Sequence, residues 1–528
     1  MNTVSRMPHE SGLLTKKEIV AVIDIGSSAL RLLIAQGRDP SEWEVLESAT
    51  QHLALGRDVF RKGSIDSHTI NQAVEILKGF LELMAPYRVN RIEAIATSAV
   101  RESENREQFI DRVMLQTGIE VRVIDGVEAN QLTWLAVREP LLQSPISLKR
   151  HNSLIIEVGA GNTDLMILQK GKITSAHALP FGTLRFLQQL EAKYHRNIEN
   201  TRELFRIHTY RTVKEMAHEL KLDRVSKLVT VGSDARLTAA TLGHHITDEL
   251  SVINRAQFRS FMEEIEFLSP DKLVNRLSLP WHEAELLYPA LVIFNAFIEA
   301  TKADEILVPS ASIRQGLLVN YATDRGTLRE IFGTQVISGA KNLAKHYNVN
   351  MKHAEFVRKQ VLIIHDTLNT ELGLKGYNRL FLETAAILHD IGEFIQGANH
   401  HKHGQYIIRN SDIFGLSATD KELVSHIVRY HRHAKPQRAH NLYMSLSRDN
   451  RVIVQKLSSL LRVAEALDRS HTQQVTISRL NIKKNRLVIY TPYTGDCSIE
   501  ESSLIDKGDL LEEVFGLKPV LRSDKNEL

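Results

Sequence analysis

The stretch VIDIGSSALRLLIA, residues 22–35, consists of two apolar runs separated by a short polar turn. A later stretch, LIIEVGAGNTDLMIL at residues 154–168, has the same parts in the same order. In both, an acidic residue ends the first run and a glycine-rich turn follows it. Each stretch therefore predicts two strands joined by a tight turn.

The two predicted hairpins can be aligned residue by residue, which indicates a duplicated α/β architecture. The alignment places Asp24 on Glu157, Gly26 on Gly159, Arg31 on Asp164 and Gln36 on Gln169. Predicted strands and amphipathic helices alternate over residues 18–125 and again after residue 153. Two similar halves predict a ligand cleft between them.

Beyond residue 325 the pattern changes to long amphipathic helices, in which histidines concentrate. After about residue 470 it changes again, to a short β-rich segment and a tail after about residue 505. The sequence thus predicts five parts: an N-terminal tail at 1–17, a first half at 18–135, a second half at 136–325, an all-helical domain at 326–470, and a small β addition with its tail at 471–528.

Length and composition are those of a multidomain globular protein. The chain has 528 residues, 43% of them hydrophobic and 24% charged, with a formal net charge of +3. No apolar stretch approaches the ~18 residues that cross a bilayer, and the N-terminus has no signal peptide, so we expect a cytoplasmic protein without a membrane partner. Interspersed charges give no case for a nucleic-acid partner. The single Cys497 excludes intramolecular disulfides.

The glycine-rich turns suit the binding of phosphate. In the first turn, Gly26, Ser27 and Ser28 let backbone N–H groups converge on an anion. Asp24 beside them would repel phosphate unless a divalent cation such as Mg²⁺ lies between them. The second turn repeats this arrangement with Glu157 as its acid. For either turn alone, the alternative is a β-hairpin whose glycines serve only its geometry.

Several further motifs accompany the hairpins along the chain. They are AIATSAVRESENREQFI (94–110), VIDGVEANQLTWLAV (123–137), LPFGTLRF (179–186), VGSDAR (231–236) and SASIRQGLL (310–318). Together with the hairpins, they resemble the exopolyphosphatase and guanosine-pentaphosphate phosphohydrolase family, Ppx/GppA, over residues 18–325. The resemblance implies an actin-like (ASKHA) fold and hydrolysis of a terminal phosphoanhydride bond. The helical part resembles the HD-type domain that longer members of the family carry.

The resemblance also implies roles for individual residues. Glu128, at the start of a helix, matches the family's water-activating base; the alternative is an acid favoured there by the helix dipole. Asp24 and Glu157 would hold Mg²⁺ or Mn²⁺, with Asp164 as another acid near the metal and the water. The residues expected to bind phosphate are Gly26, Ser27, Ser28, Arg101, Gly159, Ala160, Gly161, Asn162, Thr163, Gly232, Arg236 and Arg314.

The turns of this chain depart from the sequences usual in the family. The first turn reads DIGSSA where the family commonly has D-x-G-S-N-S, and the second reads EVGAGNTD where it has D-I-G-G-G-S-T-E. Asp234 adds an acid where the family has G-G-T-x-R. Exchanging Asp and Glu keeps each charge but moves the carboxylate by about one methylene, and catalysis is sensitive to such displacements. Slow turnover or altered specificity is left open.

In the helical domain, the order His353, His389-Asp390, Asp468 matches the metal-binding pattern of HD phosphohydrolases. These four residues are candidate ligands of a second divalent metal. Other histidines that could supply a further ion or bind phosphate are His400, His401, His403 and His431. The alternative is a structural role, in which the domain extends a polyphosphate channel or forms the dimer.

The sequence predicts a Mg²⁺-dependent phosphohydrolase, expected as a homodimer, that removes terminal phosphate from polyphosphate or guanosine pentaphosphate. Two alternatives stay open. One is a sensor that binds polyphosphate or an alarmone with weakened turnover, and the other is a hydrolase acting through the HD-type domain. The sequence does not choose between the two substrates, because chain-length preference depends on the shape of the channel.

Overall fold

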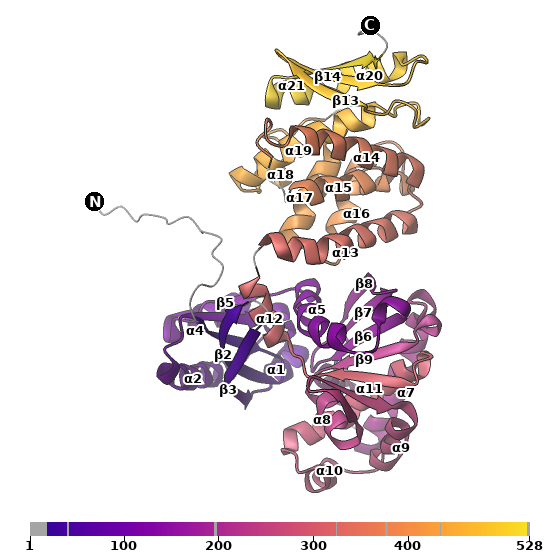
Figure 1. Ribbon diagram of the computed structural model, residues 1–528. Coiled ribbons are helices and arrows are strands. Elements are labelled where there is room, and N and C mark those ends of the chain that lie inside the picture. Colours follow the sequence, from indigo (N-terminus) through magenta and orange to yellow (C-terminus); the bar gives the residue numbers. More distant parts are fainter. Residues whose placement is uncertain are drawn as a thin grey trace, which may run out of the picture. The chain divides into compact units, whose positions relative to one another are not determined.

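The computed structural model describes residues 18–39, 42–194, 198–323, 325–374, 378–432 and 434–524. It comprises two compact units, unit 1 up to Leu328 and unit 2 from Arg329 onward. Figure 1 shows an α/β unit 1 and a unit 2 made mostly of helices, with a small sheet near the C-terminus. The predicted N-terminal tail lies outside the described residues. None of the helices in the described ranges combines the length and the apolar character that a membrane crossing requires.

The first sheet of unit 1 has five strands in the order β3-β2-β1-β4-β5. They are β1 (Glu18–Ile25), β2 (Ala29–Asp39), β3 (Glu42–His52), β4 (Arg91–Ala96) and β5 (Val121–Val123). The helices from this part of the chain are α1 (Leu55–Lys62), α2 (Ser67–Met84), α3 (Ser98–Glu102) and α4 (Arg106–Thr117). Ile23 and Leu32 of the central strands share a core with Phe80 and Phe109 of the helices. The sequence does not predict β3, because this edge strand is largely polar and gives no apolar signal.

The second sheet has seven strands in the order β10-β11-β12-β9-β6-β7-β8. They are β6 (Asn152–Val158), β7 (Thr163–Gln169), β8 (Lys172–Leu179), β9 (Lys227–Val231), β10 (His244–Thr247), β11 (Leu250–Asn254) and β12 (Glu305–Pro309). The helices are α6 (Thr183–Tyr194), α7 (Ile198–Glu219), α8 (Ser233–Leu242), α9 (Arg255–Ile265), α10 (Pro270–Leu277) and α11 (Trp281–Ala300). Strands β8-β7-β6-β9-β12 repeat the order and the directions of the five strands in the first sheet. The predicted duplication is confirmed.

The two hairpins match in register as well as in order. In the first hairpin, Asp24 lies opposite Arg31 in the antiparallel pairing of β1 with β2. In the second, Glu157 lies opposite Asp164 in the pairing of β6 with β7. Asp24 and Glu157 therefore lie at equivalent positions near the ends of β1 and β6. Their cross-strand partners, Arg31 and Asp164, are also equivalent in the alignment of the two hairpins.

The turns between the paired strands close with the same backbone hydrogen bond. The N–H of Gly26 donates to the carbonyl of Ala29 over 3.0 Å, and the N–H of Gly159 donates to the carbonyl of Asn162 over 2.8 Å. Both hairpins thus turn within two intervening residues, as the glycines predict. The turns bring their backbones to equivalent edges of the two sheets.

Helices α5 (Gly126–Gln143) and α12 (Ile313–Ala322) join the two halves of unit 1. Their packing is so close that a Cβ atom on Gly316 would lie 1.9 Å from the carbonyl oxygen of Leu132. Leu317 and Leu318 of α12 complete a core with β1 and β2 of the first sheet. The end of the predicted second half thus covers the first half, and the predicted boundary at 135/136 falls inside α5.

Unit 2 is a bundle of helices followed by a three-stranded sheet, β13-β14-β15. Its helices are α13 (Arg325–His346), α14 (Met351–Leu368), α15 (Asn378–Leu388), α16 (His400–Arg409), α17 (Ala418–Arg429), α18 (Asn441–Met444), α19 (Arg448–Ala466), α20 (Ser498–Lys507) and α21 (Asp509–Phe515). Its strands are β13 (Arg479–Lys483), β14 (Arg486–Thr491) and β15 (Lys518–Ser523). The predicted tail after residue 505 is folded as far as the described residues extend, because β15 pairs with β14 and Leu511 and Leu521 join the core.

Candidate active site

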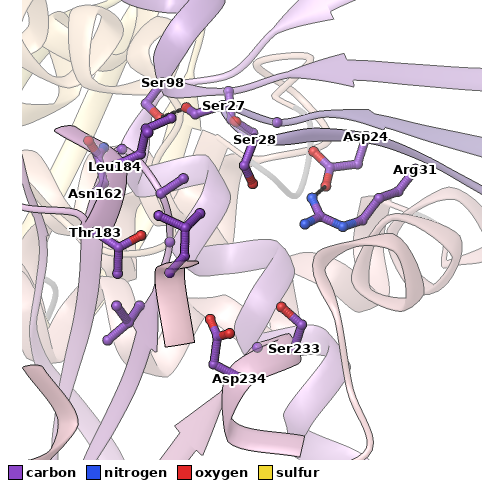
Figure 2. Close-up of a pocket in the computed structure, with 18 of the residues that line it drawn as sticks. Asp24, Ser27, Ser28, Arg31, Ser98, Asn162, Thr183, Leu184, Ser233 and Asp234 are labelled. Atoms are coloured by element: carbon purple, nitrogen blue, oxygen red, sulfur yellow. Dashed lines mark hydrogen bonds and ion pairs between the residues drawn. The ribbon is translucent and has the colours of Figure 1, made fainter. Parts of the chain in front are cut away.

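A cavity of about 530 Å³ lies between the two halves of unit 1 and is lined by both glycine-rich turns. Figure 2 shows Asp24 and Arg31 on one side of it and Asn162 and Thr183 on the opposite side. The predicted site residues that line the cavity are Asp24, Gly26, Ser27, Ser28, Arg101, Glu157, Gly159, Ala160, Gly161, Asn162, Asp164, Gly232, Arg236 and Arg314. The structure therefore brings most of the predicted set into one cavity.

Asp24 sits at the end of β1 with its carboxylate buried beneath the first turn. One oxygen, Oδ2, faces Arg31 Nη1 at 3.5 Å. The other, Oδ1, is buried and has no hydrogen-bond partner among the described residues. Burial raises the pKa of Asp24, while Arg31 and Arg314 partly offset the increase. The negative charge of Asp24 is thus only partly compensated by the neighbouring arginines.

The first turn is fixed to the element that follows β4. The hydroxyls of Ser27 and Ser98 are hydrogen-bonded over 2.9 Å, and Ser27 is buried. The carbonyl of Ser27 also accepts from the N–H of Gly56 at the start of α1, over 2.8 Å. This leaves Ser28 as the hydroxyl of the turn that faces the cavity, where Figure 2 shows it.

The second turn is held from α6 by residues in the LPFGTLRF motif. Arg185 donates from Nε to the carbonyl of Gly161 over 2.6 Å, and from Nη2 to Glu102 over 2.7 Å. A Cβ atom on Gly182 would lie 2.4 Å from the backbone of Gly161, so only glycine allows this approach. Thr163, a predicted phosphate ligand, is fully buried and donates to the carbonyl of Phe181, which makes it part of the support and not of the lining.

Glu157 and Asp164 face the cavity from the second hairpin. Glu157 Oε2 accepts a hydrogen bond from Thr133 over 2.8 Å, and burial, with Asp24 adding to it, raises the pKa of Glu157. Burial raises the pKa of Asp164 to about 8, with a further contribution from Glu157 that Arg101 partly offsets. The three carboxylates at Asp24, Glu157 and Asp164 thus disfavour one another's charge.

The arginines of the cavity are positioned by main-chain carbonyls. Arg101 donates from Nη1 to the carbonyl of Ile124 over 2.9 Å, Arg236 to that of Ala311 over 2.6 Å, and Arg314 to that of Leu32 over 2.8 Å. Each guanidinium keeps further N–H groups for an anion. Burial lowers the pKa of Arg314 to about 10, which leaves it charged at neutral pH. Arg31 and Arg57 also line the cavity and were not predicted.

Asp234, the extra acid of the VGSDAR motif, lies in the cavity wall at the start of α8. Gly232 before it adopts a φ of 118°, which favours glycine. Burial raises the pKa of Asp234 to about 7, and the nearby Glu283 contributes to the increase.

Glu128 is not among the residues that line the cavity, and its role as the base stays a prediction. Its side chain pairs with Arg122, and its backbone N–H is capped by Asp125 over 2.7 Å. The cavity is instead lined by Gly126 and Ala129 from this helix start. Consecutive helical residues point about 100° apart, so one position in the sequence decides which side chain faces the cavity.

A divalent cation fits the carboxylate group of the cavity. Asp24 Oδ1 and Asp164 Oδ1 are buried oxygens without a hydrogen-bond partner among the described residues. Carboxylate oxygens are the donors that Mg²⁺ and Mn²⁺ prefer, and a cation would offset the mutual repulsion of Asp24, Glu157 and Asp164.

Unit 2 contains a second group of metal-type side chains. His353, His389 and Asp390 form one buried set, and Asp390, His400 and His431 form another. Nε2 of His353 lies 3.2 Å from Nε2 of His389, and Nε2 of His400 lies 3.1 Å from Nε2 of His431. Asp390 stands between the two pairs, with Oδ2 at 3.1 Å from His389 and Oδ1 at 3.4 Å from His400.

Three of these rings are oriented by backbone carbonyls. Nδ1 of His389 lies 2.9 Å from the carbonyl of Ala386, and His400 and His431 make the same kind of contact with other backbone carbonyls. Because a carbonyl only accepts, Nδ1 of each of these rings carries a proton, and Nε2 is directed toward Asp390. With Nε2 of His353, these ring nitrogens and the carboxylate are the kind of donor set that a metal site uses.

Asp468, predicted as a ligand, lies behind this group. Its Oδ2 is 2.7 Å from Nδ1 of His353, and its Oδ1 accepts from the backbone N–H of Gln473 over 2.6 Å. In this position it orients the His353 ring and makes the ring a stronger donor. His401 and His403 are outside both sets of possible ligands.

With this geometry established, comparison with known proteins identifies the family. A family model described as the Ppx/GppA phosphatase family matches residues 20–324, more than half of the chain. The chain belongs to the Ppx/GppA phosphatase family. A second model, Ppx/GppA phosphatase, domain III, matches residues 337–507.

Similar proteins agree with this assignment. A guanosine-5'-triphosphate,3'-diphosphate pyrophosphatase of Pseudoalteromonas translucida is 24% identical over 468 residues, which are 86% of this chain and 88% of the relative. The crystal structure of an exopolyphosphatase from Cytophaga hutchinsonii superposes with a TM-score of 0.51 and 20% identity, over 58% of this chain and 98% of that one. This likeness in fold, with the repeated sheets, confirms the predicted actin-like architecture of a Ppx/GppA phosphatase.

Proposed function

We propose that this Ppx/GppA family member is a Mg²⁺-dependent hydrolase that releases the terminal phosphate of polyphosphate or guanosine pentaphosphate in the cavity of unit 1. The observation that carries the proposal is one cavity in which the carboxylates of the two matched hairpins meet arginines from α3, α8 and α12. Carboxylates would hold the cation, and arginines would hold the phosphate oxygens that surround it.

Asp24 and Glu157 are the proposed ligands of Mg²⁺, with Mn²⁺ as a substitute. Both lie at the same register position near the end of a strand. Burial raises the pKa of both carboxyls, and the neighbouring arginines offset this only in part. When bound, the cation would offset the negative charge of the phosphate oxygens. Thr133 fixes one oxygen of Glu157 in place through its hydrogen bond.

The phosphate chain would bind to the turns and the arginines. The backbone N–H groups of both turns supply donors without a Cβ atom in the way at Gly26 and Gly159. Arg101, Arg236 and Arg314 are already held by main-chain carbonyls, so little side-chain freedom is lost when they bind an anion.

Asp164 is the proposed acceptor of the proton from the attacking water. It lies in the cavity beside Glu157, and its Oδ1 has no hydrogen-bond partner among the described residues. Burial and Glu157 raise its pKa to about 8, and a cation bound beside it would favour the ionised form that accepts a proton. Glu128, the base that the sequence predicts, pairs with Arg122 outside the lining.

The test is phosphate release from long-chain polyphosphate and from guanosine pentaphosphate, with and without Mg²⁺. Asp164→Asn should lower release by ~100-fold or more, as loss of a general base does. Glu128→Gln should change it by less than about threefold, since it removes only a partly exposed ion pair. Asp111→Asn, on an exposed face of α4, is the matched control. Loss of activity in Glu128→Gln alone would return the base to Glu128, and binding without release in the wild type would favour the sensor.

The second candidate function is a metal-dependent hydrolase in unit 2. It is favoured by the two ligand sets that share Asp390 and by the four rings whose Nε2 atoms are directed toward that carboxylate. We infer that the group binds two divalent ions, because the Nε2 separations of 3.1 and 3.2 Å each suit two nitrogens on one ion. If unit 2 hydrolyses the same substrates, Asp164→Asn leaves phosphate release intact and His389→Gln removes it.

A further inference from the structure

A third group of metal-type side chains lies at the cavity and is separate from the carboxylates of the two turns. It consists of His52, His282 and Glu283, whose ligand atoms all lie within 4.8 Å of one another. All three residues line the cavity. None of them has a role in the proposed hydrolysis.

The group draws its ligands from both halves of unit 1. His52 is the last residue of β3, in the first sheet, whereas His282 and Glu283 are in the first turn of α11, which packs on the second sheet. The rings of His52 and His282 lie with centroids 3.3 Å apart, and Nε2 of His52 is 3.6 Å from Oε1 of Glu283. An ion bound here would therefore connect the two halves.

One donor of this group is unsatisfied by the protein. Nε2 of His282 is buried and has no hydrogen-bond partner among the described residues. The rings of His52 and His282 are in contact beside the Glu283 carboxylate, and binding of one ion by both would turn their ring nitrogens toward it.

The chemistry of the donors distinguishes this site from the one at Asp24 and Glu157. Two imidazole nitrogens and one carboxylate oxygen suit Zn²⁺ and similar transition-metal ions, whereas Mg²⁺ prefers oxygen ligands and keeps several waters. Three protein ligands leave a tetrahedral ion one open position.

A second contact between the same elements shows that they already approach each other here. Arg57 of α1 donates from Nη2 to Glu285 of α11 over 2.7 Å. This ion pair is partly exposed, so it contributes little by itself. It nevertheless brings the start of α11 and the segment after β3 together, which lowers the conformational cost of assembling a metal site from both.

We propose that His52, His282 and Glu283 bind a Zn²⁺-type transition-metal ion that fastens the two halves of unit 1 together at the cavity.

The first test is the number of Zn²⁺ equivalents bound by the full chain in excess Mg²⁺, measured by titration calorimetry. The variants are His52→Gln and His282→Gln, with His245→Gln on the exposed strand β10 as the control. Zinc held by the histidines of unit 2 is the same in all four proteins. Wild type and the control should bind one equivalent more than either variant, or bind it at least ~100-fold more tightly, since even outer-shell changes cost 10–100-fold.

Hydrogen exchange locates the effect and tests the fastening. Added Zn²⁺ should slow exchange at the end of β3 and the start of α11 in wild type, and it should not do so in His282→Gln. Equal zinc stoichiometry and affinity in all four proteins would overturn the proposal. So would displacement of this equivalent by Mg²⁺, because that result would show a site made of oxygen ligands. Zinc binding without slowed exchange at these two segments would show that the ion does not hold the two halves together, and it would overturn that part of the proposal.

Discussion

The substitution Asp164→Asn is expected to stabilise unit 1 while it lowers phosphate release by ~100-fold or more. The carboxyl has an ordinary pKa of 3.8, which burial and Glu157 raise to about 8. Keeping its proton at pH 7 therefore costs ~4 kcal/mol, at 1.36 kcal/mol for each tenfold step. Because the cavity opens to solvent and charges there are screened, about half of this, ~2 kcal/mol, is the expected gain from the neutral amide.

The sign of the effect follows from the raised pKa. A carboxyl whose pKa is higher in the folded state contributes stability below its unfolded value, and that contribution is lost as the pH rises through the folded value. The advantage of Asp164→Asn should therefore grow between pH 4 and pH 8, from ~1 kcal/mol at pH 5 to more than ~2 kcal/mol at pH 8. Mg²⁺ should reduce the difference in stability between Asp164→Asn and wild type, because a bound cation offsets the negative charge of Asp164.

Thermal unfolding of wild type and variant at pH 5, 7 and 8, with and without Mg²⁺, measures this difference. For a unit of this size, ~2 kcal/mol corresponds to a rise of ~4 °C in Tm. Asp111→Asn is the control, since that side chain is exposed. A variant no more stable than wild type at pH 8, or a gain that is equal at pH 5 and pH 8, would refute the reasoning.

Three further substitutions test other parts of the structure. Gly182→Ala should lower phosphate release at least ~10-fold, because its Cβ would lie 2.4 Å from the backbone of Gly161 and displace the second turn; the rate of release checks this. Gly316→Ala should cost ~3 kcal/mol in unfolding by urea, because its Cβ would lie 1.9 Å from the carbonyl of Leu132. Asp390→Asn should remove metal from unit 2, since that carboxylate belongs to both ligand sets; elemental analysis of protein loaded with Mn²⁺ measures the loss.

The sequence was most informative where local pattern and chemistry coincide. Both hairpins, their register and their acids follow from alternating apolar runs and glycine turns, and Asp24 and Glu157 stand where the alignment puts them. The fold of unit 1 could be inferred from these stretches because they are repeated. Strand β3 could not, because an exposed edge strand leaves no apolar pattern.

Orientation and long-range packing were the features that the sequence could not supply. Whether Glu128 or Ala129 faces the cavity depends on the rotation of α5, which is set by its cap at Asp125 and its packing against α12. Arg185 holds the second turn by its hydrogen bond to the carbonyl of Gly161, 24 residues away in the sequence. In the sequence, only the motif around Gly182 indicates this support. The position of Asp468 behind His353 likewise depends on how distant helices meet.

The packing of α12 on β1 has a consequence for how the chain is made. The first sheet has one face that Leu317 and Leu318 complete, and these residues are translated after the whole second sheet. On the ribosome, Val20, Val22 and Leu33 must therefore wait, without their final neighbours, until residue 318 has emerged. The first half is thus translated first, but its fold is completed last. A truncation before α12 would leave this face of the first sheet without Leu317 and Leu318.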